Sequence, residues 1–257
     1  MVFARKRFGQ NFLHDPQVIA HIIEAINPQP DEALVEIGPG RGALTEPLLE
    51  HCSALDAIEI DRDLAAELRQ RLAGRGLTLH EADALKFDFA ALAASRGRRL
   101  RVIGNLPYNV STPLLFHLLE ARSSIIDLHI MLQREVIERI CAAPGSGEYG
   151  RLTVMLAPWV IAEHLFDVGP GAFRPVPQVW SAVARLRMRQ TPAFPVDARY
   201  ARAVSAAFSQ RRKTLRNALR SLLDAEKIAS CGIDPGARPE TLSPAEFAAL
   251  AAAVEAN

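Results

Sequence analysis

Short apolar runs alternate with helix-like segments through the first half of the chain. Strands are expected at Ala33–Ile37, Ala54–Ile60, Leu77–His80, Arg101–Ile103 and Leu128–Leu132. Helices are expected after Asp15-Pro16 and at Ala43–Leu49, 63–72 and Pro113–Leu119. This alternation predicts an α/β fold with a mostly parallel, doubly wound sheet. Ligands of such sheets bind outside the carboxyl ends of the strands, so the residues that follow each strand are the first candidates for a site.

The character of the chain changes in two proline-rich segments, Phe173–Pro177 and Thr191–Val196. Beyond them the pattern predicts short helices at Ala201–Phe208, Leu215–Leu223 and Pro244–Val254. We therefore expect an α/β domain over residues 1–191 and a small all-helical domain over residues 192–257.

The composition is typical of a protein that folds in water. Of the 257 residues, 49% are hydrophobic, yet no apolar run approaches the roughly 18 residues of a membrane span, and the start lacks the apolar stretch of a secretory signal. The three cysteines lie far apart, and neither they nor the histidines show metal-ligand spacing. We expect a cytoplasmic protein with no metal ion and no membrane partner.

The formal net charge of +1 conceals an uneven distribution. Between Val168 and Leu223 there are eleven lysines and arginines and one acid, Asp197, whereas acids outnumber bases in the remainder. A cationic segment on an otherwise anionic chain is typical of contact with a polyanion. If residues 209–223 are helical, Arg212, Arg216 and Arg220 share one face, which suits phosphate contacts more than base reading. A solvated basic face is the alternative.

A glycine-rich turn follows the first predicted strand, with Gly38, Gly40 and Gly42 at alternate positions. Glycine lets the backbone approach a ligand closely, but this GxGxG spacing differs from the GxGxxG of dinucleotide sites. Glu59 ends the second strand, where a carboxylate can accept hydrogen bonds from two ribose hydroxyls. Asp83 follows the third strand and can accept from an adenine amine. These groups favour an adenosine-containing ligand; a tight turn with two helix caps is the alternative.

The residues Asn105-Leu106-Pro107-Tyr108 stand where the fourth strand should end. Pro107 lacks an N–H and pushes Leu106 toward extended geometry, so we expect a rigid loop. The Asn105 side-chain oxygen and the Leu106 carbonyl can both accept hydrogen bonds from one planar amine. Tyr108 offers a face on which an extruded base can stack. The loop therefore predicts a clamp for a planar amine.

A series of motifs resembles one family over nearly the whole chain. The motifs are KRFGQNFL (6–13), EIGPGRGALT (36–45), EID (59–61), DAL (83–85), NLPYNVSTPLL (105–115), MLQREV (131–136), YGRLTV (149–154), FRPVPQVWSAV (173–183) and FSQRRKTLRNAL (208–219). The combination of NLPY with FGQNFL and FSQRRKTLRN is highly specific. By these motifs the chain resembles the S-adenosylmethionine-dependent rRNA adenine dimethyltransferases, and within them the KsgA/RsmA type that acts on small-subunit rRNA.

The resemblance implies a Rossmann-like class I methyltransferase domain followed by a helical RNA-binding domain. It implies two methyl transfers from S-adenosylmethionine to each of two adjacent adenosines near the 3′ end of 16S rRNA, in a small ribosomal subunit or its precursor, by a monomer. The implied cofactor contacts are Gln10, Asn11, Leu13, Gly38, Gly40, Glu59, Asp83 and Asn105. The implied catalytic group is Asn105, Leu106, Pro107, Tyr108 and Phe173, with Phe173 stacking on the other side of the adenine. The RNA contacts would be Arg211, Arg212, Lys213, Arg216 and Arg220.

Three other functions are open at this point. A large-subunit rRNA dimethyltransferase of the antibiotic-resistance type would use the same chemistry on another substrate. A NAD-dependent oxidoreductase is disfavoured by the GxGxG spacing and by the absence of an evident hydride-transfer acid. A non-catalytic RNA-binding assembly factor would not need the intact set of Glu59, Asp83 and the Asn105–Tyr108 loop.

Overall fold

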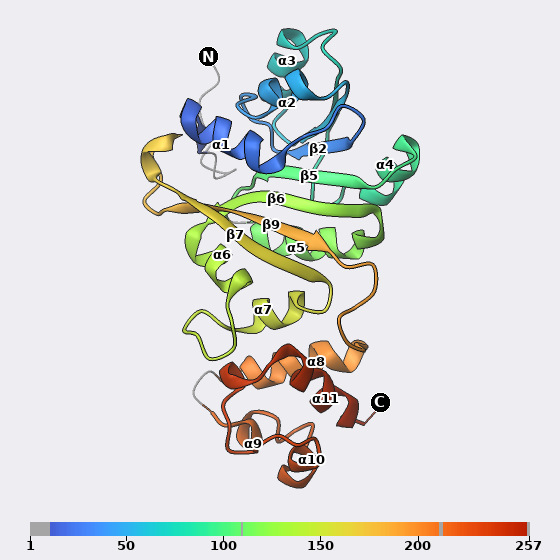
Figure 1. Ribbon diagram of the computed structural model, residues 1–257, viewed down its shortest axis with the longest axis vertical. Helices are drawn as coiled ribbons and strands as arrows, with labels where there is room; N and C mark the ends of the chain where they lie inside the picture. Colours follow the sequence, from blue (N-terminus) through green and yellow to red (C-terminus); the bar gives the residue numbers. More distant parts are fainter. Residues whose placement is uncertain (1–10, 109, 211–212, 256–257) are drawn as a thin grey trace. The chain divides into compact units, whose positions relative to one another are not determined.

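The computed structural model describes residues 11–108, 110–210 and 213–255 (Figure 1). The chain divides into two compact units, Met1–Ile137 with Ala162–Met188, and Glu138–Ile161 with Arg189–Asn257. The second unit takes in residues 138–161, a segment that the sequence pattern did not assign to it. The boundary at 191/192 remains a prediction of where an RNA-binding domain begins.

A seven-stranded sheet in the order β4-β3-β2-β5-β6-β9-β7 organises the first unit. The strands are β2 (Ala33–Ile37), β3 (Leu55–Glu59), β4 (Leu77–Glu81), β5 (Leu100–Asn105), β6 (Ile125–Gln133), β7 (Val160–Val168) and β9 (Ser181–Met188). Strands β2 to β6 pair in parallel, and β9 is antiparallel to β6. The predicted mostly parallel sheet is confirmed. The sequence pattern had not assigned β7 and β9, which complete one side of it.

Helices cover both faces of this sheet (Figure 1). They are α1 (Pro16–Ile26), α2 (Thr45–His51), α3 (Arg62–Arg71), α4 (Phe89–Arg96), α5 (Ser111–Glu120) and α6 (Arg134–Cys141), with a 3-10 turn η2 (Arg122–Ser124). Helix α1 begins where predicted, because the Asp15 carboxylate accepts hydrogen bonds from the N–H groups of Gln17 and Val18 at 2.9 and 3.2 Å. Its isoleucines pack with α2 on one face of the sheet, and α5 lies on the other side.

The direction in which strands are added reverses between β2 and β5. The chain moves outward from β2 to β3 and β4, then returns to the opposite side of β2 as β5. The connections therefore diverge at the carboxyl ends of β2 and β5 and leave a crevice there. Gly104 of β5 packs so closely that an added Cβ would lie 2.8 Å from the Ile37 carbonyl oxygen. The two strands thus meet without intervening side chains just beneath the crevice.

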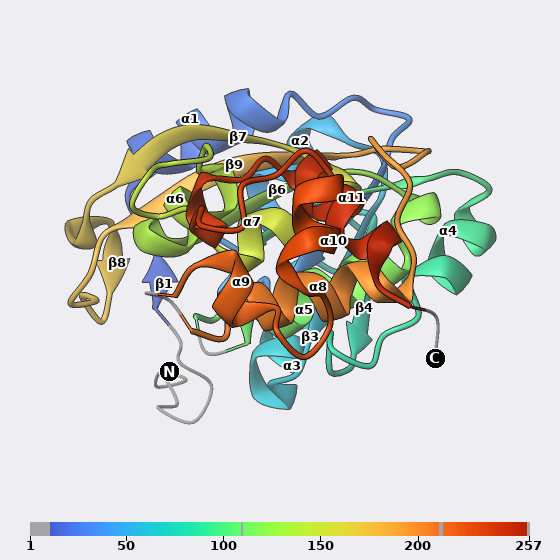
Figure 2. The same cartoon turned by 90° about the horizontal axis from the view of Figure 1, so that it is seen from below.

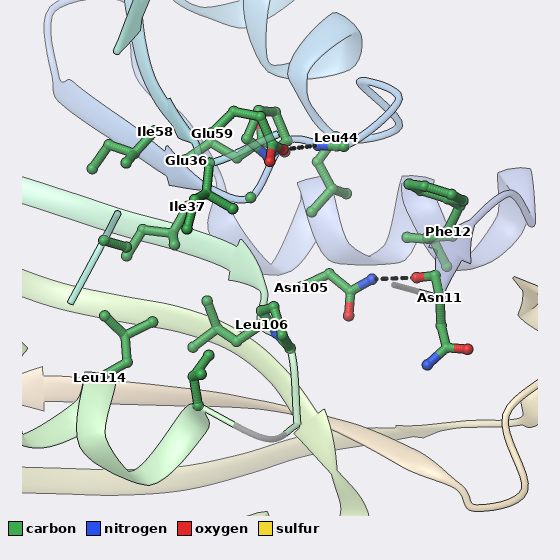
Figure 3. A pocket seen from close by; sticks show the side chains of 18 of the residues that line it. Asn11, Phe12, Glu36, Ile37, Leu44, Ile58, Glu59, Asn105, Leu106 and Leu114 are labelled. Atoms are coloured by element: carbon green, nitrogen blue, oxygen red, sulfur yellow. Dashed lines mark hydrogen bonds between the residues drawn. The ribbon is translucent and has the colours of Figure 1, made fainter. Parts of the chain in front are cut away.

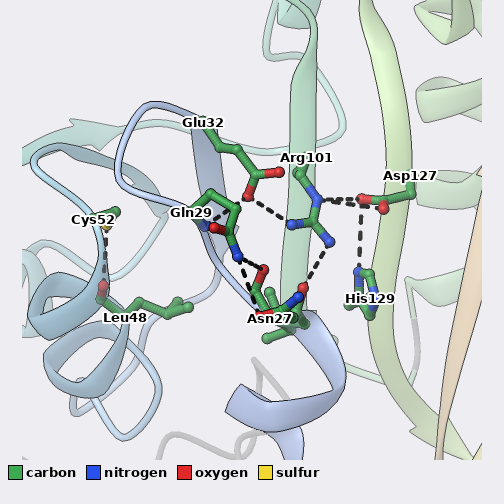
Figure 4. A network of polar contacts seen from close by, with 9 residues as sticks. Asn27, Gln29, Glu32, Leu48, Cys52, Arg101, Asp127 and His129 are labelled. Atoms are coloured by element: carbon green, nitrogen blue, oxygen red, sulfur yellow. Dashed lines mark hydrogen bonds and ion pairs between the residues drawn. The ribbon is translucent and has the colours of Figure 1, made fainter.

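A buried ionic network lies near the start of β5 (Figure 4). The Arg101 guanidinium donates to Glu32 at 2.7 Å, to the Ile26 carbonyl at 2.8 Å and to Asp127 at 3.1 Å. Burial by itself raises the pKa of Asp127. Two neighbours outweigh this effect and hold the pKa below its ordinary value: Arg101, and the His129 ring, whose Nδ1 lies 3.6 Å from the Asp127 carboxylate. The network joins the end of α1 to the neighbouring strands β5 and β6.

The second unit is a helical cluster (Figure 2). Its helices are α7 (Arg151–Leu156), α8 (Ala198–Phe208), α9 (Leu215–Ala218), α10 (Ala225–Ser230) and α11 (Pro244–Ala253), with a 3-10 turn η4 (Pro239–Thr241). They enclose an apolar core that includes Tyr149, Tyr200 and Phe247. Among the described residues of the whole chain, no helix combines the length and apolar character that crossing a bilayer requires.

The helix predicted at Leu215–Leu223 is shorter than expected. Helix α9 ends at Ala218, and a tight turn follows in which the Leu222 N–H donates to the Leu219 carbonyl at 2.7 Å. The N–H groups of Leu215 and Arg216 donate to the carbonyls of residues 237 and 235 at 2.9 and 3.0 Å. Because a distant loop satisfies these first amides, tertiary contacts determine where the helix begins.

Candidate cofactor and base-binding site

A cavity of about 270 Å³ occupies the crevice at the carboxyl ends of β2, β3 and β5 (Figure 3). The segment that leads into β1 (Phe12–Leu13) forms another wall. Ten of the residues predicted from the sequence line this one cavity: Asn11, Leu13, Gly38, Gly40, Glu59, Asp83, Asn105, Leu106, Pro107 and Tyr108. Segments far apart in the chain therefore converge on one place, while the individual role of each residue remains a prediction.

The glycine loop after β2 is organised around the Glu59 carboxylate. Gly38 and Gly40 have φ values of +67° and +56°, in the left-handed region that side chains with a Cβ rarely adopt. The Gly40 N–H donates to one Glu59 oxygen at 3.0 Å, and the Asp61 N–H donates to the other at 2.9 Å. A carboxylate offers about four acceptor positions. Each oxygen therefore retains capacity for a hydroxyl donor of a ligand, as a ribose would supply.

Two lining residues were not singled out from the sequence. Glu36 is 2% exposed. Burial raises the pKa of Glu36 to about 7. The Glu59 charge reinforces this rise, and a 2.6 Å hydrogen bond from the Thr45 hydroxyl opposes it. Ile60 is 49% exposed and presents an apolar surface to the cavity. An acid inside the apolar run ALVEI and an isoleucine just after a strand end were the available sequence signals.

The loop after β5 is fixed by hydrogen bonds at both ends. The Asn105 side-chain NH₂ donates to the Asn11 carbonyl at 3.1 Å (Figure 3), which leaves the amide oxygen as the acceptor that a ligand can use. The Leu106 N–H donates to the Met131 carbonyl at 3.1 Å. The Tyr108 hydroxyl is hydrogen-bonded to the Ser181 hydroxyl at 2.6 Å. Burial raises the pKa of Tyr108, with the Ser181 contact opposing it.

Phe173 is not brought to the cavity. Its side chain is fully buried in the apolar cluster beneath α1. It belongs to β8 (Phe173–Arg174), which follows the 3-10 turn η3 (Pro170–Ala172) and pairs antiparallel with β1, so that Phe173 lies opposite Leu13. In this structure Phe173 packs in the same apolar cluster as Leu13, which lines the cavity, and the stacking of Phe173 on adenine remains a prediction.

Some predicted residues lie elsewhere or outside the described part of the chain. Gln10, Arg211 and Arg212 fall outside the described residues. Lys213, Arg216 and Arg220 are exposed in the second unit. Among the described residues, no group of three or more His, Cys, Asp and Glu side chains is arranged to hold a metal ion.

Four features together define a Rossmann-like methyltransferase fold: the strand order, the glycine loop after β2, the carboxylate at the end of β3 and the polar loop after β5. Two solved structures share it over most of the chain. The 23S rRNA methyltransferase ErmE is 29% identical with a TM-score of 0.74, covering 95% of this chain and 99% of that one. A dimethyladenosine transferase from Plasmodium falciparum is 23% identical with a TM-score of 0.80, covering 93% and 95%.

A model of the ribosomal RNA adenine dimethylase family matches residues 1–255, and the chain belongs to this family. It is 56% identical over 251 residues to the ribosomal RNA small subunit methyltransferase A of Methylococcus capsulatus, covering 96% of both chains. It is 53% identical to the protein of the same name from Pseudomonas syringae pv. tomato, covering 96% of this chain and 93% of that one. The family resemblance of the sequence motifs is confirmed, and the protein is an rRNA adenine dimethyltransferase.

Proposed function

We propose that the protein transfers methyl groups from S-adenosylmethionine to the N6 amines of two adjacent adenosines near the 3′ end of 16S rRNA. The product is N6,N6-dimethyladenosine in the small ribosomal subunit or its precursor, formed by a monomer in the cytoplasm during subunit biogenesis. The observation that carries the proposal is the Asn105 side chain, whose NH₂ is bound to Asn11 and whose oxygen is available at the edge of an adenosine-sized cavity.

The cavity fits the nucleoside part of the cofactor. Glu59 keeps acceptor capacity on both oxygens for ribose hydroxyls, and Asp83 stands at the end of the next strand, where it can accept from the adenine amine. Ile60 supplies apolar surface for the adenine ring. Asn11 and Leu13 close the cavity from the N-terminal side. The bound cofactor would supply an electrophilic methyl group on a sulfonium.

The loop after β5 orients the attacking amine. The lone pair of an adenine N6 amine is delocalised into the ring, which makes the amine a poor nucleophile. If the Asn105 oxygen and the Leu106 carbonyl accept its two N–H bonds, the amine is held with its lone pair toward the methyl group. The rate enhancement then comes mainly from orientation. Tyr108, fixed by Ser181 at 2.6 Å, stacks on the extruded base.

The RNA is held by the basic segment of the second unit. Lys213, Arg216 and Arg220 are exposed, and together with Arg211 and Arg212 they supply cations for the phosphate backbone. Such contacts position an RNA without reading its sequence. Recognition of a folded ribosomal RNA by shape is consistent with this arrangement.

The small subunit is favoured over the large one by degree of similarity. The small subunit methyltransferases A are 53–56% identical to this chain over nearly their whole length. The 23S rRNA enzyme ErmE is 29% identical.

The test is methyl transfer from labelled S-adenosylmethionine to small and large subunits isolated from cells that lack the modification, followed by nucleoside analysis. We expect N6,N6-dimethyladenosine in the small subunit alone. Label confined to the large subunit would instead identify a resistance-type enzyme. Cofactor binding without transfer to either subunit would contradict the catalytic role and support that of an assembly factor.

A further inference from the structure

An exposed apolar patch lies on the segment that joins β8 to β9. Six large apolar side chains are exposed in the described part of the chain, and three of them belong to this segment: Val176 (64%), Val179 (41%) and Trp180 (50%). Of the other three, Ile60 lines the cofactor cavity. Tryptophan with half its surface in water is uncommon unless that surface has a partner.

The Trp180 ring is held in place on two sides. The Arg134 N–H donates to the Trp180 carbonyl at 2.9 Å, and the Arg134 guanidinium carbon lies 5.8 Å from the ring centroid. A second edge of the ring lies beside Gly169, where an added Cβ would meet ring carbons at 3.8 and 3.9 Å. These contacts restrict the orientations of the exposed indole, which lowers the entropic cost of stacking on it.

The segment that carries the patch leads directly into a residue that contacts the loop proposed to receive the target base. Trp180 directly precedes Ser181, whose hydroxyl is hydrogen-bonded to the Tyr108 hydroxyl at 2.6 Å. Ser181 opens β9 opposite Gln133, the last residue of β6. Trp180 thus lies at the carboxyl end of β6, on the edge of the sheet that carries the cavity.

Two cations, one over the indole and one on the same segment, suit a nucleic acid. Arg134 lies over the ring and Arg174 is exposed at the start of the same segment. One acid is close, since Asp167 lies 3.7 Å from the Arg134 guanidinium. An aromatic face with cations beside it is the arrangement that binds unstacked nucleotides without sequence preference.

We propose that Trp180 is a stacking platform for an unpaired nucleotide flanking the target adenosine, with Arg134 and Arg174 contacting its phosphates. This inference rests on the proposed function for the position of the target base. It adds a substrate-binding subsite outside the cofactor cavity, formed by Trp180, Val179 and Arg134.

Tryptophan fluorescence tests the contact without any turnover. The chain has two tryptophans, so Trp159→Phe leaves Trp180 as the sole indole and Trp180→Phe leaves Trp159. Titration with a short single-stranded oligoadenylate should quench the emission of the Trp159→Phe protein, because a base stacks directly on the ring. The Trp180→Phe protein should show little change. Fluorescence anisotropy of labelled oligoadenylate measures binding independently in both proteins.

Kinetics on unmodified small subunits give a second readout. Trp180→Ala should raise KM about tenfold, as expected for the loss of one stacked base, with kcat and S-adenosylmethionine affinity near those of the wild type. Trp180→Phe should restore most of the binding. Ile126→Ala removes another exposed apolar side chain, 42% exposed at the start of β6, and should leave KM unchanged.

The outcomes separate this inference from the proposed function. Oligoadenylate that binds without quenching Trp180 would overturn the stacking platform, even if the wild-type enzyme methylates small subunits normally. A raised KM for subunits without quenching by oligoadenylate would also overturn it and indicate a ribosomal protein as the partner. Quenching of Trp180 in an enzyme that modifies only large subunits would support the platform and refute the 16S substrate.

Discussion

The decisive side chains of the cavity are oriented by backbone groups. Asn105 is fixed by the Asn11 carbonyl, and Glu59 by the N–H groups of Gly40 and Asp61. Any substitution other than one by proline, which lacks the N–H, leaves a backbone donor or acceptor in place. The orientation of Asn105 and Glu59 is therefore preserved as long as the loops that carry Asn11 and Gly40 keep their conformation.

Replacing Asn105 tests whether its oxygen orients the amine. Asn105→Ala should lower kcat for methyl transfer about 100-fold, the usual cost of removing one preorganised polar contact at a reacting centre. Transfer to unmodified small subunits under saturating cofactor is the measurement. The control is Asn217→Ala, an exposed amide that bonds the Thr214 hydroxyl at 3.2 Å, which should leave kcat unchanged. Equal kcat values in the two variants would exclude the proposed role of Asn105.

Glu36 should make the protein less stable as pH rises. Its pKa is about 7 in the fold against an ordinary 4.5, so between these values the folded state binds a proton that the unfolded chain has released. Stability is then lost as pH rises through this window, by an amount on the order of 3 kcal/mol. Glu36→Gln removes this component while keeping a polar partner for Thr45.

Thermal unfolding measured across that pH range checks the prediction for Glu36. The difference in Tm between Glu36→Gln and the wild type should grow in favour of the variant as pH rises. Glu50→Gln, an exposed position on α2, removes the same charge and should show no such trend. Parallel Tm curves for Glu36→Gln and the wild type would contradict the raised pKa.

At the scale of elements, the site depends on how closely β2 and β5 approach and on where short helices begin. Gly104 permits that approach. Helix α9 begins at Leu215 because residues 235 and 237 accept its first N–H groups. Neither contact is local in sequence.

Gly104→Ala should move β5 and the loop that follows it. The new Cβ would lie 2.7 Å from a Leu106 methyl and 2.8 Å from the Ile37 carbonyl oxygen. We expect a loss of about 1–3 kcal/mol of stability by overpacking and reduced methyl transfer, because Leu106 is displaced. Urea unfolding and transfer assays measure the two effects. The control is Gly171→Ala, because an added Cβ there meets nothing within 4 Å; it should change neither stability nor methyl transfer. If Gly104→Ala also changed neither, β5 would be able to shift at no cost.

Removing three exposed basic residues of the second unit tests whether they contact RNA phosphates. The triple variant Lys213→Ala, Arg216→Ala, Arg220→Ala should weaken small-subunit binding and reduce the slope of log affinity against log salt by about 2–3, since each phosphate contact contributes nearly one unit. Cofactor affinity should not change. The matched control, Arg62→Ala, Arg75→Ala, Arg98→Ala, removes the same charge from exposed positions of the first unit. An unchanged slope in the first variant would refute the phosphate contacts.

At the scale of the whole molecule, the first unit is tied together by the Arg101 network. Arg101 contacts residues from the end of α1, from the lead into β2 and from β6, and its side chain is 9% exposed. Without it, the largely buried Asp127 would keep only His129 as a partner, and the half-buried Glu32 would lose its ion pair. A single residue therefore stabilises three segments that are distant in sequence.

Arg101→Met should cost about 3–5 kcal/mol, the usual penalty for removing one partner of a buried ion pair. Urea unfolding is the measurement. Arg185→Met breaks the more exposed pair with Glu163, whose side chains are 34% and 47% exposed, and should cost no more than about 1 kcal/mol. Similar losses in the two variants would mean that the network contributes no more than a surface pair.

Much of the site followed from the sequence because its residues occupy strand ends. Gly38, Glu59, Asp83 and Asn105 each follow or close a strand, and parallel strands bring their carboxyl ends to one edge. The burial of Phe173 could not be predicted, because it depends on the pairing of β8 with β1. The length of α9 also escaped prediction: the helix begins at Leu215 as expected but ends at Ala218, where a turn closed by the Leu222 N–H and the Leu219 carbonyl follows it.

By itself the sequence determined the alternation of strands and helices, the mostly parallel sheet, the family and the set of residues at one edge. These properties depend on local hydrophobic periodicity, on proline and glycine geometry and on short motifs. Only the tertiary structure decided that Glu36 is buried, that the Asn105 NH₂ is bound to Asn11, and that Trp180 is exposed next to Ser181, the partner of Tyr108. Burial and hydrogen-bond partners depend on segments that meet only after folding, and no local pattern records them.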